Sequence, residues 1–216
     1  MTTDLDHPRT ITVTGTGRAH VRPDLADLRL GVTITASTVE SARSGSASTL
    51  TAVLGKLRTL GIEDRDLQTS MVSVSPQYDY SREGAPPRLV GYQLSNVVAV
   101  VIRDIERVSQ AIDAALTGGA TNVDRMVFRV ADPSAAEREA REAAIADARA
   151  KAETFAKAAG VTIGGVAAII ESGAPVPYPI GISERMAFAA KDASTPIEAG
   201  ENEVTATVTV AYLLAD

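Results

Sequence analysis

The 216-residue sequence contains no cysteine and no tryptophan, and only 4% of its residues are aromatic. Without cysteine the chain has no disulfide, no thiolate nucleophile and no Cys-ligated zinc or iron–sulfur cluster. The two histidines, His7 and His20, stand apart and form no HxH or HExxH pattern. A zinc site needs three or four convergent ligands, so we expect the protein to need no metal and no other cofactor.

Positive charge is also scarce, because 21 Lys and Arg residues are outnumbered by 27 Asp and Glu residues, for a net charge of −6. Nucleic-acid binding concentrates Lys and Arg on one surface, so we expect no nucleic-acid partner. No window approaches about 18 consecutive apolar residues, so we expect no membrane span. The first residues are polar and acidic and lack the basic and apolar regions of a secretory signal, so we expect a soluble, cytoplasmic protein.

Apolar and polar residues alternate in two neighbouring segments, residues 11–21 and 26–36, which predicts two β-strands. Residues 22–24 (RPD) have the composition of a turn, so we expect the two strands to form an antiparallel hairpin. Gly15 and Gly17 in the first strand indicate a bulge or the close approach of another backbone. Further strands are predicted at residues 68–74, 94–102, 123–130, 161–170 and 204–214.

Three helices are predicted, and the longest runs over residues 134–159 and ends at Gly160. Its predicted buried stripe consists of small residues at spacings of four or three: Ala140, Ala144, Ala148, Ala152, Phe155 and Ala159. Such a stripe favours close packing on a sheet or on another helix. The element order ββαββαβαββ predicts an α+β fold of antiparallel sheets with three helices.

We expect residues 1–9 to be a disordered terminus and residues 10–216 to form the folded part, with a division into subdomains at about 10–103 and 104–216 as an open alternative. Residues 173–200 have no sustained period and read as a long loop or arm. Six apolar or aromatic residues of this segment are the candidate self-association arm: Val176, Tyr178, Ile180, Ile182, Met186 and Phe188. Exposed apolar surface of that extent usually marks an interface.

No catalytic motif stands out. The segment around Gly15 and Gly17 lacks the helix that a phosphate loop requires, and no serine lies in a Gly-x-Ser-x-Gly pattern. Asp24, Asp27 and Tyr92 are the residues that an undescribed hydrolase would use. An enzyme should show a deep pocket in which such polar groups converge.

Short motifs are spread over almost the whole chain, at residues 11–17 (ITVTGTG), 22–24 (RPD), 30–32 (LGV), 61–62 (GI), 66–70 (DLQTS), 74–76 (VSP), 91–92 (GY), 95–96 (SN), 101–104 (VIRD), 147–153 (DARAKAE), 159–161 (AGV) and 196–201 (PIEAGE). Their order and spacing resemble those of the SIMPL domain family. The resemblance implies an α+β fold with a long helix and a poorly defined function. Family members are linked with oxidative-stress tolerance, some form large rings, many bacterial members are exported, and no catalytic residues are established.

Together these observations favour a non-enzymatic, self-associating scaffold or binding protein, a homo-oligomer whose role is related to stress by resemblance and whose protein partners are unknown. The alternative is a small-molecule-binding protein or an undescribed hydrolase. A deep pocket with convergent polar groups would favour that alternative.

Overall fold

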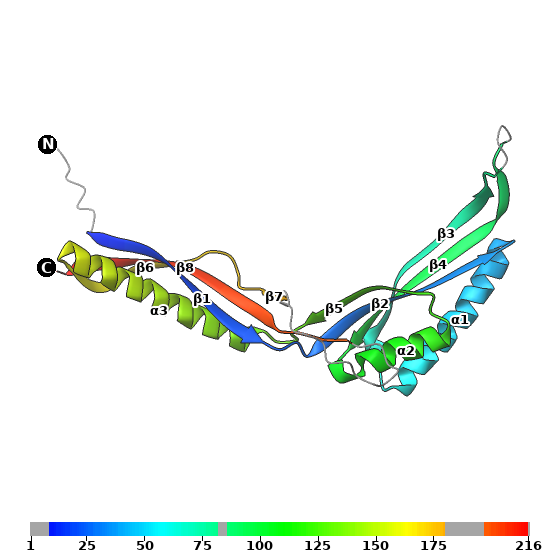
Figure 1. Ribbon diagram of the computed structural model, residues 1–216, viewed down its shortest axis with the longest axis horizontal. Coiled ribbons are helices and arrows are strands. Elements are labelled where there is room, and N and C mark those ends of the chain that lie inside the picture. Colours follow the sequence, from blue (N-terminus) through cyan, green and yellow to red (C-terminus); the bar gives the residue numbers. More distant parts are fainter. Residues whose placement is uncertain (1–8, 82–85, 180–196, 216) are drawn as a thin grey trace. The chain divides into compact units, whose positions relative to one another are not determined.

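The computed structural model describes residues 9–81, 86–179 and 197–215 (Figure 1). The chain divides into two compact units. Among the described residues, the α3 unit consists of 9–22, 130–179 and 200–215, and the two-helix unit consists of 23–81, 86–129 and 197–199. The chain therefore leaves the first unit, builds most of the second and returns, instead of dividing once near residue 103. Residues 1–8 of the expected disordered terminus lie outside the described residues.

The expected order ββαββαβαββ is confirmed, with one additional short strand, β7, inside the segment expected to be an arm. Two short 3₁₀ helices, η1 and η2, precede β3 and α2. The elements are β1 (Thr10–Val21), β2 (Leu25–Ala36), α1 (Val39–Thr59), η1 (Asp64–Asp66), β3 (Leu67–Asp79), β4 (Arg88–Ile102), η2 (Ile105–Arg107), α2 (Val108–Gly118), β5 (Asn122–Arg129), α3 (Ser134–Ala159), β6 (Thr162–Glu171), β7 (Pro177–Pro179) and β8 (Asn202–Ala215).

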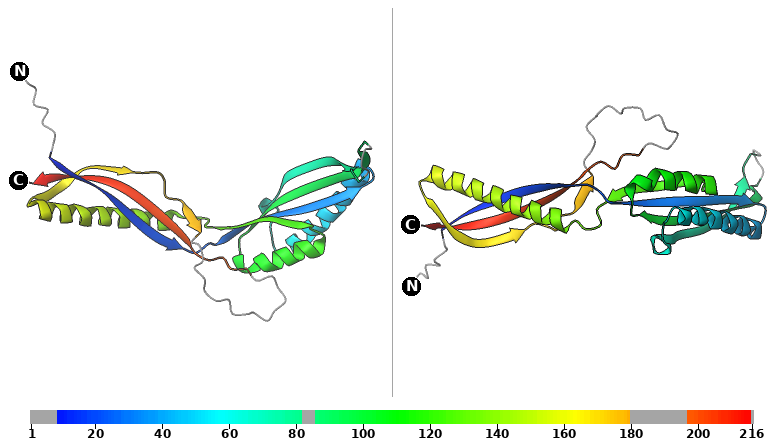
Figure 2. Two further views of the ribbon diagram at one scale, coloured as in Figure 1. Left: turned by 45° about the horizontal axis from the view of Figure 1, so that its top comes forward. Right: turned by 90° about the horizontal axis from the view of Figure 1, so that it is seen from below.

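In the α3 unit, an antiparallel sheet of order β1–β8–β6 packs one face against α3, and β7 pairs with the beginning of β8 (Figure 2). A Cβ atom on Gly15 would lie 2.1 Å from the carbonyl oxygen of Ala144, and one on Gly17 would lie 2.1 Å from that of Ala140. The glycines are therefore needed for the close approach of the β1 and α3 backbones, which confirms one reading of the sequence.

The buried stripe of α3 follows a strict four-residue repeat. Its members are Ala136, Ala140, Ala144, Ala148, Ala152 and Ala156. Phe155 and Ala159, which were predicted to be buried, are exposed. On a helix of 3.6 residues per turn each four-residue step advances the stripe by about 40°, so the stripe winds around α3 and stays buried because the strands of the sheet are themselves twisted.

In the two-helix unit, the antiparallel sheet has the order β3–β4–β2–β5, and α1 and α2 pack on one face (Figure 2). Large aliphatic residues of β2 and β4, such as Leu28, Leu30 and Val100, meet Leu57 of α1 and Ile112 of α2. The strand predicted at residues 94–102 is confirmed as part of β4, which is a central strand of the sheet. None of the described helices packs on the opposite face, which we call the open face.

The expected hairpin between the first two strands is wrong. β1 pairs with β8 over its whole length, while β2 pairs with β4 and β5 in the other sheet. The buried faces explain this outcome, because Gly15 and Gly17 fit only against a stripe of alanines, whereas Leu28 and Leu30 need the larger side chains of α1 and α2. Two strands with such different inner faces do not share one packing layer.

None of the described helices is long and apolar enough to cross a membrane.

Candidate functional site

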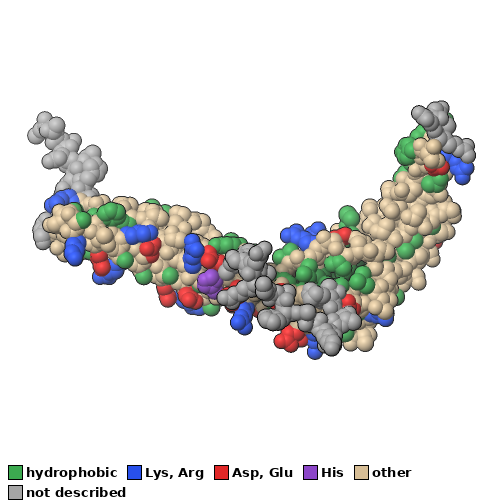
Figure 3. Space-filling view, in the orientation of Figure 1, with side chains coloured by type: hydrophobic (Ala, Val, Ile, Leu, Met, Phe, Trp, Pro, Cys, Tyr) green, Lys and Arg blue, Asp and Glu red, His purple; other side chains and the backbone are tan. Residues whose placement is uncertain are grey.

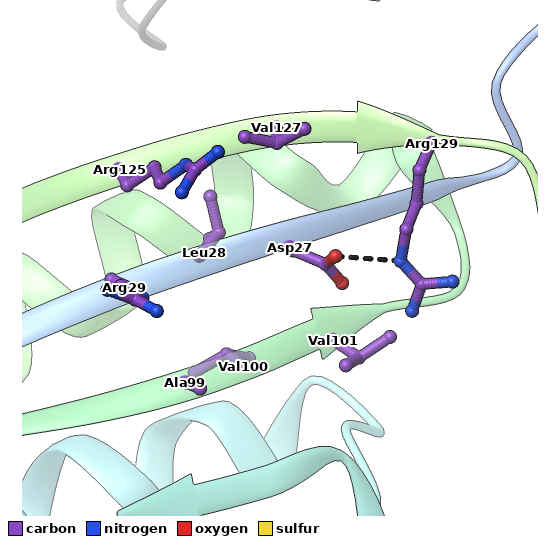
Figure 4. Close-up of a pocket in the computed structure, with 9 residues that line it drawn as sticks. All are labelled: Asp27, Leu28, Arg29, Ala99, Val100, Val101, Arg125, Val127 and Arg129. Atoms are coloured by element: carbon purple, nitrogen blue, oxygen red, sulfur yellow. Dashed lines mark hydrogen bonds and ion pairs between the residues drawn. The ribbon is translucent and has the colours of Figure 1, made fainter. Parts of the chain in front are cut away.

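The open face of the two-helix unit carries a cluster of charged side chains (Figure 4). Since side chains alternate along a strand, the inward placement of Leu28 and Leu30 puts Asp27 and Arg29 on the open face. Arg125 and Arg129 join them from β5, which lies beside β2. The cluster borders a concavity of about 400 Å³, lined by Asp27, Leu28, Arg29, Ala99, Val100, Val101, Arg125, Val127 and Arg129.

Two pairings organise this cluster. Arg129 Nε donates a 2.7 Å hydrogen bond to Asp27 Oδ2, and both side chains are partly exposed. Asp27 Oδ1 is buried and accepts no hydrogen bond from the described residues. Arg29 stands directly opposite Arg125 in the register of β2 and β5, and neither guanidinium forms an ion pair with a described carboxylate. Of the three arginines that line the concavity, Arg129 is therefore paired with a carboxylate, and Arg29 and Arg125 are not paired with any described carboxylate.

The residues proposed for hydrolysis do not converge. Asp27 lines the concavity, but it is held by Arg129. Asp24 is exposed and lies outside the lining. Tyr92 pairs with Ala36, whose position on β2 is roughly 30 Å along the strand from Asp27. No shared cleft brings these three groups together, so the geometry gives no support to the hydrolase alternative.

The segment around Gly15 and Gly17 is covered by α3, which leaves no room for a phosphate group at these glycines. His20 is exposed near the end of β1, and His7 lies outside the described residues. Among residues 9–81, 86–179 and 197–215, no three His, Cys, Asp or Glu side chains are placed to share a metal ion. The expectation that folding needs no metal stays a prediction.

A second surface of interest is the edge strand β3. Every residue of this 13-residue strand is exposed or half-buried, and residues 67–78 include no charged side chain. Met71, Val72 and Val74 are 51%, 58% and 46% exposed. Hydrophobic side chains also lie at the surface near the tip of the β3–β4 hairpin (Figure 3). No strand of the described residues pairs with the outer edge of β3, so the strand offers a backbone edge together with an apolar surface.

The candidate self-association arm lies only partly within the described residues. Val176 is 66% exposed. The Tyr178 hydroxyl donates a hydrogen bond to Glu203 and lies 3.2 Å from Thr205 Oγ1, so this part of the arm is held on its own sheet. That hydrogen bond lowers the pKa of the Glu203 carboxyl below its ordinary value. Ile180, Ile182, Met186 and Phe188 lie outside the described residues.

Sequence reasoning missed the arginines of the open face. The available signal was the i, i+2 spacing of Asp27 and Arg29 in one strand and the i, i+4 spacing of Arg125 and Arg129 in another. Such spacings put charges on one face of each strand. They do not show that the two strands are neighbours.

This architecture defines a two-unit α+β protein with an open, arginine-bearing sheet face and an uncharged sheet edge. The family model described as SIMPL, a protein of unknown function (DUF541), matches residues 11–212. The chain belongs to the SIMPL family, as its motifs indicated.

Curated relatives agree with this assignment. The chain is 38% identical over 211 residues to the 26 kDa periplasmic immunogenic protein of Brucella melitensis, and the match covers 95% of this chain and 84% of that protein. It is 28% identical over 156 residues to the uncharacterized protein YggE of Edwardsiella ictaluri, covering 72% of this chain and 65% of that protein. The uncharacterized protein YggE of Escherichia coli K12 is 27% identical over 151 residues, covering 70% and 60%.

The relatives correct the expectation of a cytoplasmic protein. The Brucella protein that matches 95% of the chain is named periplasmic, which points to export. The expectation rested on the polar composition of the first residues, and that stretch carries no information about the compartment in which the folded domain works. The names of these relatives refer to the periplasm and to immunogenicity, and they do not mention stress tolerance.

Proposed function

We propose that this protein is a non-enzymatic, self-associating binding protein whose copies join through the edge of β3. The observation that carries the proposal is the absence of charge along the outer strand of the sheet from residue 67 to residue 78. Natural proteins protect such edges with charged residues, bulges or covering elements, because an open edge pairs with other chains. In β3 the register with β4 shifts between Thr69 and Met71 and between Gln77 and Tyr78, and Pro76 lies in the strand. The stretch from Met71 to Ser75 is uncharged and free of these interruptions, so it is suited to strand addition, in which backbone hydrogen bonds supply affinity.

The opposite edge of the same sheet provides the contrast. β5 carries Asp124, Arg125 and Arg129, so a second copy pairing there would bury charge. β3 carries instead Met71, Val72 and Val74, whose exposed apolar surface would leave water on association. Within this unit the physical chemistry therefore favours β3 over β5 as the edge that pairs.

Edge strand β6 in the α3 unit and the candidate self-association arm are further contributors to the proposal. Residues 162–170 of β6 are uncharged, and Val166, Ile169 and Ile170 are exposed. In the arm, Val176 and Tyr178 are exposed.

The test replaces Val72 and Val74 together by lysine and measures the mass of the native particle in solution. Both side chains are exposed, so the folded chain should lose at most about 0.5 kcal/mol per substitution. We expect the variant to dissociate, because two lysines at the contact would have to be desolvated. Leu116→Lys, an exposed position on α2, is the matched control and should keep the parent mass.

A double-lysine variant of β3 that keeps the parent mass would contradict the role of β3. If Ile169→Lys with Ile170→Lys dissociated the particle instead, the interface would be assigned to β6. Deletion of residues 173–195 tests the arm in the same way, and an unchanged mass would remove it from the interface.

We also propose that the protein is exported, because the Brucella relative that matches most of the chain is named periplasmic. Fractionation of cells that carry the native gene checks this proposal. Recovery of the protein with periplasmic markers is expected, and recovery with cytoplasmic markers alone would refute export.

A further inference from the structure

The pair Arg29 and Arg125 poses a physical problem that the described chain does not solve. Their side chains stand directly opposite each other on neighbouring strands, which brings the Cβ atoms to roughly 4.5–5.5 Å. Like charges in this position destabilise a sheet. Arg129, in the same concavity, is neutralised by Asp27, but no described carboxylate lies within ion-pair distance of Arg29 or Arg125.

A bound anion would remove this repulsion. A guanidinium presents planar N–H donors that match a carboxylate or phosphate in a bidentate manner, and two adjacent guanidinia can hold one such group between them. At the other end of the concavity the guanidinium of Arg129 already pairs with the Asp27 carboxylate, so that end has no unpaired cation for a second anion. The favourable position for the anionic group is therefore the Arg29–Arg125 end.

The other side chains that line the concavity indicate the chemistry of the rest of the ligand. Ala99 and Val101 of β4 and Val127 of β5 line the same concavity and are apolar (Figure 4). The volume of about 400 Å³ lies within the range of small-molecule sites. A ligand that places its charge on the arginines and its body along these three side chains would satisfy both parts of the surface.

We propose that the open face of the two-helix unit binds a small amphiphilic anion, a carboxylate or phosphate carried on an apolar body, with Arg29 and Arg125 holding the anionic group. None of the residues that line this concavity belongs to β3. Arg29 also borders a second concavity with Met71 of β3 and with Asp124. Because the concavity is open to solvent, the expected dissociation constant for a small probe is on the order of 0.1–1 mM.

The experiment titrates the full chain with octanoate by isothermal calorimetry. Octanoate should bind. Inorganic phosphate should bind more weakly, because it has no apolar part to remove water from the apolar side chains of the concavity. Octylamine should not bind, although the net charge of the protein is negative. Arg29→Gln and Arg125→Gln should each weaken octanoate binding about tenfold or more. Arg43→Gln is the matched control, because Arg43 is an exposed arginine of the same unit that pairs with Glu40 on α1.

Thermal unfolding without ligand checks that the variants fold. Arg125→Gln should unfold at the same temperature as the parent or higher, since the substitution relieves the repulsion. Three results would overturn the proposal: no octanoate binding by the parent, unchanged binding by both site variants, or an equal loss in Arg43→Gln, which would mean that net charge alone attracts the anion.

Discussion

At the scale of single residues, Asp66 is the carboxylate whose environment has the clearest consequence for stability. Only 5% of its side chain is exposed, and Arg103 donates to it through Nε at 2.9 Å and Nη2 at 2.8 Å. These hydrogen bonds lower the pKa of Asp66 below its ordinary value, while burial acts in the opposite direction. The pair links the end of η1 to the residue that follows β4, and so holds the start of β3 beside the end of β4.

The lowered pKa of Asp66 makes the folded state sensitive to acid. An aspartate in the unfolded chain titrates near pH 3.9, so the stabilisation is fully present above that pH and is lost as the pH falls through the lower pKa of the folded state. Asp66→Asn should lower the free energy of unfolding at pH 7 by roughly 1.5–3 kcal/mol. The loss relative to the parent should shrink progressively below about pH 4, because the unfolded parent then binds a proton at Asp66 while the folded parent, with its lower pKa, still resists it.

Denaturant unfolding of parent and variant at pH 7 and pH 3 measures both quantities. Asp64→Asn is a suitable control, because Asp64 is largely exposed and pairs with Arg58 on the surface. An equal loss of stability at both pH values would mean that Asp66 acts through packing and not through its charge.

At the scale of elements, the contact between α3 and β1 depends on side-chain size. Ala148 is fully buried, and its backbone N would lie 2.6 Å from a Cβ atom placed on Gly15. Ala148→Leu should therefore overpack this contact and lower the free energy of unfolding by roughly 1–3 kcal/mol. Ala150→Leu, two residues along on the exposed side of α3, should change it by less than about 0.5 kcal/mol.

Chemical unfolding of both leucine variants under the same conditions is the measurement. Equal stability of Ala148→Leu and the parent would show that α3 is not packed closely on β1.

The elements themselves could be predicted because their signals are local. Alternation predicted β2 to its last residue, and Gly160, which has a positive φ, marked the end of α3. The pairing of elements could not be predicted in the same way. Nothing near Thr10–Val21 in the sequence indicates that its partner is the last strand of the chain, and the turn-like residues 22–24 favoured a hairpin with β2 instead.

The candidate site could not be predicted from the sequence either, because it also depends on which strands are neighbours. Asp27 was noticed because it lies near Asp24 in the sequence, but its partner Arg129 is supplied by β5, about a hundred residues away. Arg29 and Arg125 become a pair only once β2 and β5 are neighbours. Long-range strand pairing depends on which inner faces fit together, and that information is spread over the whole chain.

At the scale of the whole molecule, we propose that copies of this chain associate through the uncharged edge of β3. Three features support this association: β3 is uncharged over residues 67–78, it carries exposed apolar side chains, and the opposite edge strand β5 is charged. The same features would cause indefinite aggregation if the association were unspecific. A specific assembly closes on a fixed number of copies, since closed symmetry is the rule for soluble oligomers.

The mass of the native particle, measured by sedimentation equilibrium on the purified chain at micromolar concentration, tests this claim most directly. The account predicts a single species whose mass is a fixed multiple, two or more, of the mass of one chain and does not change over a tenfold dilution. A monomer at that concentration, or a broad distribution that grows with concentration, would contradict it.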